Sequence, residues 1–137
     1  MKTENLVNGY VLPNLFYELI FLGEHSVDIG TIDWSDDTAV GQIIKRFVLP
    51  RFATFTTETK SVIYSTIRYL LATESATSER WDKIWQACSA PIPTPRGIPH
   101  FVKLCYEILF MSDSLPDPDE LACYCVNHDM HAANRLN

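Results

Sequence analysis

Residues 57–73 read TETKSVIYSTIRYLLAT, and this stretch decides the fold. Its apolar residues recur at the helical spacing i, i+4, i+7 and i+8: Ile63, Ile67, Leu70 and Leu71. Three polar residues fall on the opposite face: Ser61, Ser65 and Arg68. The pattern predicts an amphipathic helix, capped by Thr56 or Thr57, that lies on a hydrophobic core. The other apolar segments need such a surface to pack on.

Further helices are predicted on both sides of this one. Pro13 is favoured at the first helical position and Gly23 is a typical stop, so a first helix is predicted between them. Ser35 offers an N-cap to a second helix, which Pro50 is predicted to end. Similar signals and apolar stripes mark three more helices. The predicted ranges are 13–23, 35–50, 57–73, 78–88 and 99–111, with a last helix from 117.

The connections between these helices are long. Residues 24–34 have no helical period and are predicted to form a loop. Residues 90–99, APIPTPRGIP, hold four of the eight prolines and predict an extended connector. The tail, residues 132–137, is predicted to fray. We therefore expect an all-α fold, an irregular single domain over 1–137 of five or six helices, rather than an up-and-down bundle.

The charge of the chain disfavours direct binding to nucleic acid. The formal net charge is −6 and the pI is about 5.1, whereas phosphate binding relies on lysine and arginine. The charge is uneven, with a net −4 over residues 1–50, +2 over 51–100 and −4 over 101–137. Such a field suits a basic partner, although it is also compatible with a role in solubility alone.

The sequence predicts a cytosolic protein without cofactor. The apolar run near the N-terminus is interrupted by Asn8, Pro13 and Glu18, and Glu4 lies where a signal peptide carries positive charge. No run reaches the roughly 18 apolar residues of a membrane span. The four cysteines are few for a disulfide framework, so they are expected to be thiols: Cys88, Cys105, Cys123 and Cys125.

The densest group of potential metal ligands is CYCVNHDMH, residues 123–131. On a helix, Cys125, His128 and His131 would share one arc while Cys123 points away. One helical turn cannot surround zinc with four ligands, and no second ligand pair is visible. We therefore predict surface histidines and half-buried thiols here, and leave a metal-dependent enzyme as a lesser alternative.

Arg96 and His100, in RGIPH, resemble the arginine and histidine pair of small all-helical ribonucleases of the HEPN type. That family places four to six residues between the pair on a helix, whereas three residues intervene here. Gly97 and Pro99 also predict a loop at this point. The pair is therefore not predicted to be catalytic, and no other nucleophile and base pair is found.

Acidic residues gather at two places, around Trp34 and at the start of the last predicted helix. Carboxylates around an aromatic ring are typical of a surface that binds a basic protein. The alternative is a capped helix with a solvated loop and Trp34 folded inward. The candidate partner-binding residues are Asp28, Asp33, Trp34, Asp36, Asp37, Asp117 and Asp119.

In its size, its acidity and its lack of catalytic residues, the chain resembles a class of proteins: the bacterial immunity proteins that neutralise nuclease toxins, including those of contact-dependent growth inhibition. No motif carries the resemblance, so no functional residue is transferred. The resemblance implies a cytosolic inhibitor of a basic partner protein. Such an inhibitor has no enzymatic activity and no membrane segment. Two other classes stay open: a homo-oligomeric adaptor or phage-encoded regulator, and the metal-dependent enzyme of the C-terminal cysteine and histidine cluster.

Overall fold

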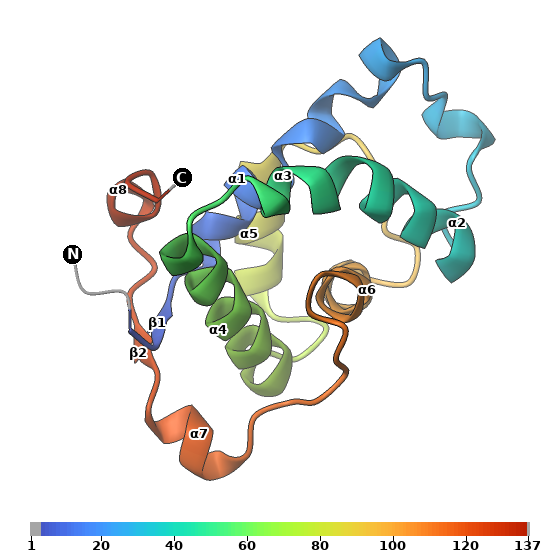
Figure 1. The fold of residues 1–137 in the computed structure, drawn as a ribbon. Coiled ribbons are helices and arrows are strands. Elements are labelled where there is room, and N and C mark those ends of the chain that lie inside the picture. Colours follow the sequence, from blue (N-terminus) through green and yellow to red (C-terminus); the bar gives the residue numbers. More distant parts are fainter. Residues whose placement is uncertain (1–3, 137) are drawn as a thin grey trace.

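The computed structural model describes residues 4–136 and confirms the all-α prediction (Figure 1). Helix α4 (Thr57–Thr73) has the predicted bounds, and the Thr56 hydroxyl caps it by accepting a hydrogen bond from Thr59 N. The remaining helical elements are α1 (Leu12–Leu15), α2 (Asp37–Ile43), α3 (Leu49–Ala53), α5 (Glu79–Cys88), α6 (Ile98–Phe110), α7 (Pro118–Ala122) and α8 (Met130–Ala133), with short 3₁₀ turns η1 (Gly9–Val11) and η3 (Ile29–Thr31).

Helix α4 is covered on more sides than its pattern predicts. The apolar stripe is buried as expected except for Leu71, which is partly buried, but Ser65 and Arg68 on the predicted polar face are also buried, with 6% and 4% exposure. Only Ser61 of that face is exposed. The reason is that β1 (Leu6–Val7), η1 and α6 all pack on α4, while a C-terminal segment closes over Arg68.

The second predicted helix continues through Pro50 instead of ending there. Helix α2 runs into a π-helical turn, η4 (Ile44–Val48), and then into α3. The Leu49 N–H bonds to the Ile44 carbonyl five residues back. This wider turn makes room for the proline ring, which in a regular helix would meet the carbonyl of Arg46. The N-cap is Asp36, one residue after the predicted Ser35.

The first predicted helix is broken. Helix α1 ends at Phe16, and the chain continues as a 3₁₀ segment, η2 (Tyr17–His25), with a non-helical residue at Phe21. Leu19 and Leu22 are fully buried. Apolar residues on nearly all sides give this segment no amphipathic period, so packing against its neighbours decides its geometry.

Helices α5 and α6 begin and end close to the predicted residues. The Ser78 hydroxyl caps α5, and the connector before α6 has no helix, as predicted. Gly97 precedes α6 with φ 97° and ψ 152°, a conformation that is nearly confined to glycine. This turn directs the chain from the connector into α6.

The C-terminal region differs most from its prediction. Asp117 caps α7 as predicted, but the chain then forms strand β2 (Cys125–Val126), which pairs in parallel with β1. The tail is not frayed over its described part, because Ala133 and Leu136 are buried in the core. Residue 137 lies outside the described residues. Within residues 4–136, no helix combines the length and apolar character that a bilayer span requires.

Candidate functional site

The acidic start of α2 and the RGIPH segment, far apart in the sequence, meet in the structure. Arg96 Nη1 donates a hydrogen bond of 2.9 Å to Asp37 Oδ1, and His100 Nε2 lies 2.8 Å from the same oxygen. His100 belongs to the first turn of α6, so the prediction that it lies in a loop is wrong. Pro99 is accommodated because the first helical turn needs no N–H at that position.

This contact keeps Asp37 ionised. The hydrogen bond with His100 is the main cause that lowers the pKa of Asp37, and the nearby charges of His100 and Arg96 lower it further. Asp37 and Arg96 are 41% and 48% exposed, so the ion pair lies at the surface. The negative charge of Asp37 is therefore compensated within the molecule.

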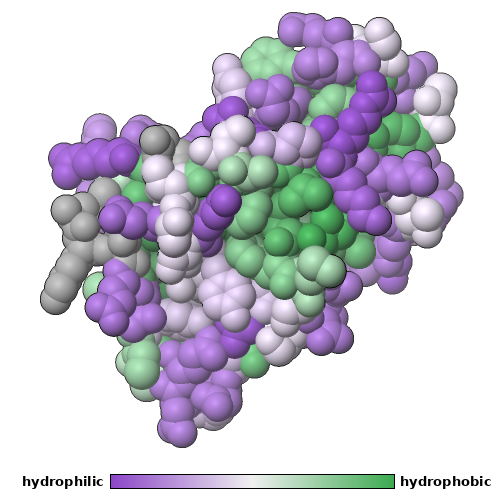
Figure 2. Space-filling model, viewed as in Figure 1, coloured by the Kyte–Doolittle hydropathy of each residue, from purple (hydrophilic) through white to green (hydrophobic). Residues whose placement is uncertain are grey.

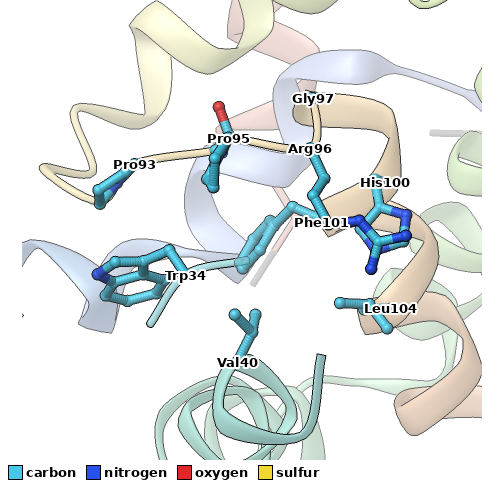
Figure 3. A pocket seen from close by; sticks show the side chains of 10 residues that line it. Trp34, Val40, Pro93, Pro95, Arg96, Gly97, His100, Phe101 and Leu104 are labelled. Atoms are coloured by element: carbon cyan, nitrogen blue, oxygen red, sulfur yellow. The ribbon is translucent and has the colours of Figure 1, made fainter. Parts of the chain in front are cut away.

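A small hollow lies beside the three residues. Trp34 and Val40 come from one side, and His100, Phe101 and Leu104 of α6 from the other (Figure 3). The space inside it that a water-sized sphere can occupy is about 10 Å³, far below the roughly 300–1,000 Å³ of small-molecule sites. Among residues 4–136, no hydroxyl or thiol forms a hydrogen bond with His100. The geometry joins α2 to α6 rather than forming a nucleophile and base pair.

The segment between η2 and α2, residues 26–36, forms an acidic lobe. Asp28, Asp33 and Asp36 are exposed. Each accepts a backbone hydrogen bond of 3.0 Å, from the N–H groups of Gly30, Ser35 and Thr38 respectively. Bonds from the side chain and backbone of Ser35 lower the pKa of Asp33. Within the described chain, none of the three carboxylates forms an ion pair, so their charges face solvent in fixed positions.

Trp34 supports the acidic lobe from inside. It is 8% exposed, and its Nε1 donates a hydrogen bond of 3.0 Å to the Ile29 carbonyl. This is the inward arrangement that the sequence left open as an alternative. The ring fixes the shape of the lobe, and we do not include it in the surface offered to a partner.

The second acidic group lies elsewhere on the molecule. Asp117 caps α7 by accepting a hydrogen bond of 2.8 Å from Glu120 N, and Asp119 is exposed on the same short helix. Helix α7 lies at the end of the molecule opposite to the acidic lobe (Figure 1). The two groups that the sequence marked therefore form two separate surfaces.

The cysteine and histidine cluster does not assemble in the structure. Cys125 lies in a strand rather than on the helix assumed for it. His128 Nδ1 accepts a hydrogen bond of 2.8 Å from Gly9 N, and burial lowers the pKa of His128. His131 is exposed. Among residues 4–136, no three histidine, cysteine or acidic side chains are placed to share a metal ion.

All four cysteines are free thiols, as predicted. Cys88 and Cys105 are buried, and burial raises the pKa of both, that of Cys88 to about 12. Cys123 and Cys125 are exposed. The buried pair is therefore unreactive at neutral pH, in contrast to the exposed pair.

Sequence reasoning missed a buried arginine in α4. Arg68 donates two hydrogen bonds from Nη2 to the Glu120 carboxylate, at 2.8 and 2.9 Å, and a third from Nε at 3.0 Å. Its Nη1 donates to Tyr106 Oη and to the Ser114 carbonyl, both at 2.7 Å. Tyr124 also hydrogen-bonds to Glu120. We call these residues the Arg68 cluster; it holds the segment that leads into α7 against α4 and α6.

Comparison of the chain with protein-family models, with curated proteins and with solved structures found no match.

Proposed function

We propose that this protein is a small acidic binding protein that inhibits a basic partner, with the acidic lobe as its contact surface. One observation carries the proposal: Asp28, Asp33 and Asp36 are exposed, fixed by backbone hydrogen bonds, and without an ion-pair partner among residues 4–136. The partner class we favour is a nuclease-type toxin. The protein then acts as an immunity protein in the bacterial cytoplasm, for example in contact-dependent growth inhibition.

The physical argument rests on preorganisation and charge. Side chains that are already fixed lose little further entropy when a partner binds. A nuclease carries a cationic surface because it must hold phosphates, and fixed carboxylates complement that surface and steer the encounter. The net charge of −6 adds a long-range field of the same sign.

The test removes the lobe's charges without removing its caps. In the lobe variant, Asp28, Asp33 and Asp36 are all replaced by asparagine, which retains the accepting oxygen of each cap. In the matched control, three other exposed acids are replaced by asparagine: Asp117 and Asp119 of the α7 surface and Asp113 of the segment before α7. Each tagged protein is used to purify partners from the source cells at low and high salt. The partner is then identified by mass and assayed with and without the protein.

We expect the wild type and the control to retain a stoichiometric basic protein at low salt and to block its activity. The lobe variant should bind at least roughly tenfold more weakly, since several charge contacts are lost. If the lobe variant bound the partner as tightly as the wild type, the lobe would be excluded as the contact surface. If only the control lost binding, the contact would be assigned to the α7 surface. A partner that is bound but fully active would contradict inhibition.

A second candidate function, the homo-oligomeric adaptor or phage-encoded regulator, is favoured by a different observation. An apolar area faces outward between α3 and α6 (Figure 2). Met111, at the end of α6, is 91% exposed, and partly buried Leu49, Ile108 and Phe110 lie on the same elements. An apolar symmetric contact would give a dimer that high salt does not dissociate. Sedimentation of the wild type and of Met111→Ser at two salt concentrations decides between the candidates.

A further inference from the structure

A second hollow lies between η2 and the helix that continues through Pro50. Because that helix does not end at the proline, residues at helical spacing along η4 and α3 line one wall, and η2 supplies Glu18 and His25 on the other. The hollow measures about 820 Å³ out to its open mouth. The residues that line the helical wall are Arg46, Phe47, Pro50, Arg51 and Thr54.

One arginine in this hollow is held in place. Arg51 donates hydrogen bonds to Asn14, from Nε to the carbonyl oxygen at 2.6 Å and from Nη2 to Oδ1 at 2.5 Å. Its guanidinium also lies 4.8 Å from the centre of the Tyr17 ring. These contacts leave Nη1, which lies 3.6 Å from Glu18 Oε1 at the edge of the hollow. Arg51 is thus oriented before any ligand arrives.

A second arginine and a histidine border the same space. The Arg46 guanidinium lies 4.9 Å from the centre of the Phe47 ring, and the His25 ring lies 5.4 Å from it. Arg46 is exposed and forms no ion pair within residues 4–136. Phe47 itself is 7% exposed and forms an apolar floor.

The charges of the hollow are opposite in sign to those of the whole protein. Its only carboxylate is Glu18, which lies 3.6 Å from Arg51 Nη1 and 3.8 Å from His25 Nε2. The two arginines outnumber it even when His25 is neutral. A cationic site in a protein of net charge −6 is not explained by the contact surface proposed above.

We propose that this hollow binds a phosphate monoester group. Guanidinium groups bind phosphate oxygens through charge-assisted hydrogen bonds, and two arginines with a neighbouring histidine suit a dianion better than a single carboxylate. Phe47, which is 7% exposed, supports Arg46 and His25 from below through its ring. A π-helical turn such as η4 is frequent at functional sites, and here it places Arg46 and Arg51 on one wall. The site is independent of the acidic lobe.

The test uses three probes, inorganic phosphate, phenyl phosphate and phosphotyrosine within a short peptide, with the unphosphorylated peptide as a reference. Binding is followed by NMR through the backbone amide and arginine Nε–H signals. Arg46→Gln removes the unpaired cation from the hollow. Lys45→Gln is the matched control, because Lys45 is an exposed neighbouring cation that does not line the hollow. Glu18→Gln removes the competing carboxylate.

We expect saturable shifts at His25, Arg46, Phe47 and Arg51 with phenyl phosphate. Arg46→Gln should weaken binding by roughly tenfold, the value of one charge-assisted hydrogen bond, and Lys45→Gln by less than about twofold. Glu18→Gln should strengthen it. Equal losses in the Arg46 and Lys45 variants, shifts that map elsewhere, or no saturation below roughly 10 mM would overturn the proposal. Tighter binding of the phosphopeptide than of phenyl phosphate would assign the group to a phosphorylated side chain, and the reverse to a free metabolite.

Discussion

Two arginines join segments that are distant in the sequence, and they do so in opposite environments. Arg68 is 4% exposed and makes bonds to Glu120, Tyr106 and Ser114, whereas Arg96 is 48% exposed and bonds to Asp37 alone. A buried guanidinium has lost its water, so the protein must supply every partner. An exposed guanidinium keeps its hydration and gains little from one carboxylate. The comparison predicts that the Arg68 cluster carries stability, while the Asp37 contact carries mainly orientation.

The largest effect is expected from Arg68→Met. Methionine keeps much of the side-chain volume but removes the donor to the Glu120 carboxylate and to Tyr106 Oη, while the Ser114 carbonyl keeps only the hydrogen bond from Tyr106 Oη. We expect the free energy of unfolding to fall by about 3 kcal/mol. Urea denaturation followed by circular dichroism measures the loss. A change below about 1 kcal/mol would mean that the segment before α7 is held mainly by contacts other than those of Arg68, such as the hydrogen bond from Tyr106 Oη to the Ser114 carbonyl.

The next effect concerns the backbone that orients the exposed cluster. Gly97→Ala places a side chain at φ 97°, which should cost about 2 kcal/mol in unfolding free energy and move Arg96 and His100 relative to Asp37. Gly23→Ala is the matched control, because no atom lies within 4 Å of the added methyl group. Thermal denaturation gives the melting temperatures of both variants, and each is compared with that of the wild type. Equal effects would show that the conformation of Gly97 does not matter for the fold.

The caps and periodic stripes explain why α4, α5 and α6 could be predicted from the sequence. Their start signals act within one helical turn, as Thr56 and Ser78 do, and the core selects one face. Rules based on neighbouring residues failed where a partner distant in the sequence determines whether a side chain is buried. The helical pattern places Arg68 on the face that is expected to meet solvent, and its partner Glu120 lies 52 residues away. No spacing rule joins such residues.

The candidate sites show the same limit. The acids of the lobe were visible in the sequence, because each is a turn or helix cap with a local signal. The pairing of Asp37 with Arg96 and His100 spans 59 and 63 residues and could not be read from either segment. The cationic hollow was hidden for another reason. The sequence predicts a helix stop at Pro50, whereas the chain stays helical through the π-helical turn and α3, which puts Arg46 and Arg51 on one wall.

A moderate effect is expected at the carboxylate of the buried cluster. The hydrogen bond from Tyr124 and those from Arg68 lower the pKa of Glu120 below its ordinary 4.5. A lowered pKa in the folded state means stability that is present above pH 4.5 and lost as the pH falls through the folded value. Glu120→Gln should cost about 1 kcal/mol at neutral pH, a value reduced by the partial exposure of Glu120.

Unfolding free energies of wild type and Glu120→Gln between pH 7 and pH 3 give the readout. The difference between the two proteins should shrink as the medium becomes acidic, since the wild-type carboxylate is then protonated. A constant difference over the whole range would show that Glu120 acts through shape and hydrogen bonds and not through its charge.

The smallest effect is expected at the exposed contact. Asp37→Asn keeps a side-chain oxygen near His100 and Arg96 but removes the charge, so stability should fall only slightly. The distinguishing property is salt dependence. Raising the salt from about 0.05 M to about 1 M shortens the screening length to about 3 Å and should abolish the difference between Asp37→Asn and wild type. Most of the loss in Arg68→Met should persist, because the Arg68 guanidinium itself is 4% exposed and its hydrogen bonds to Tyr106 and Ser114 do not depend on a salt-screened charge pair. If the Asp37 loss also persisted, the two clusters would be of one kind, and the start of α2 would be fixed by the Asp37 contact rather than by its packing beside Trp34.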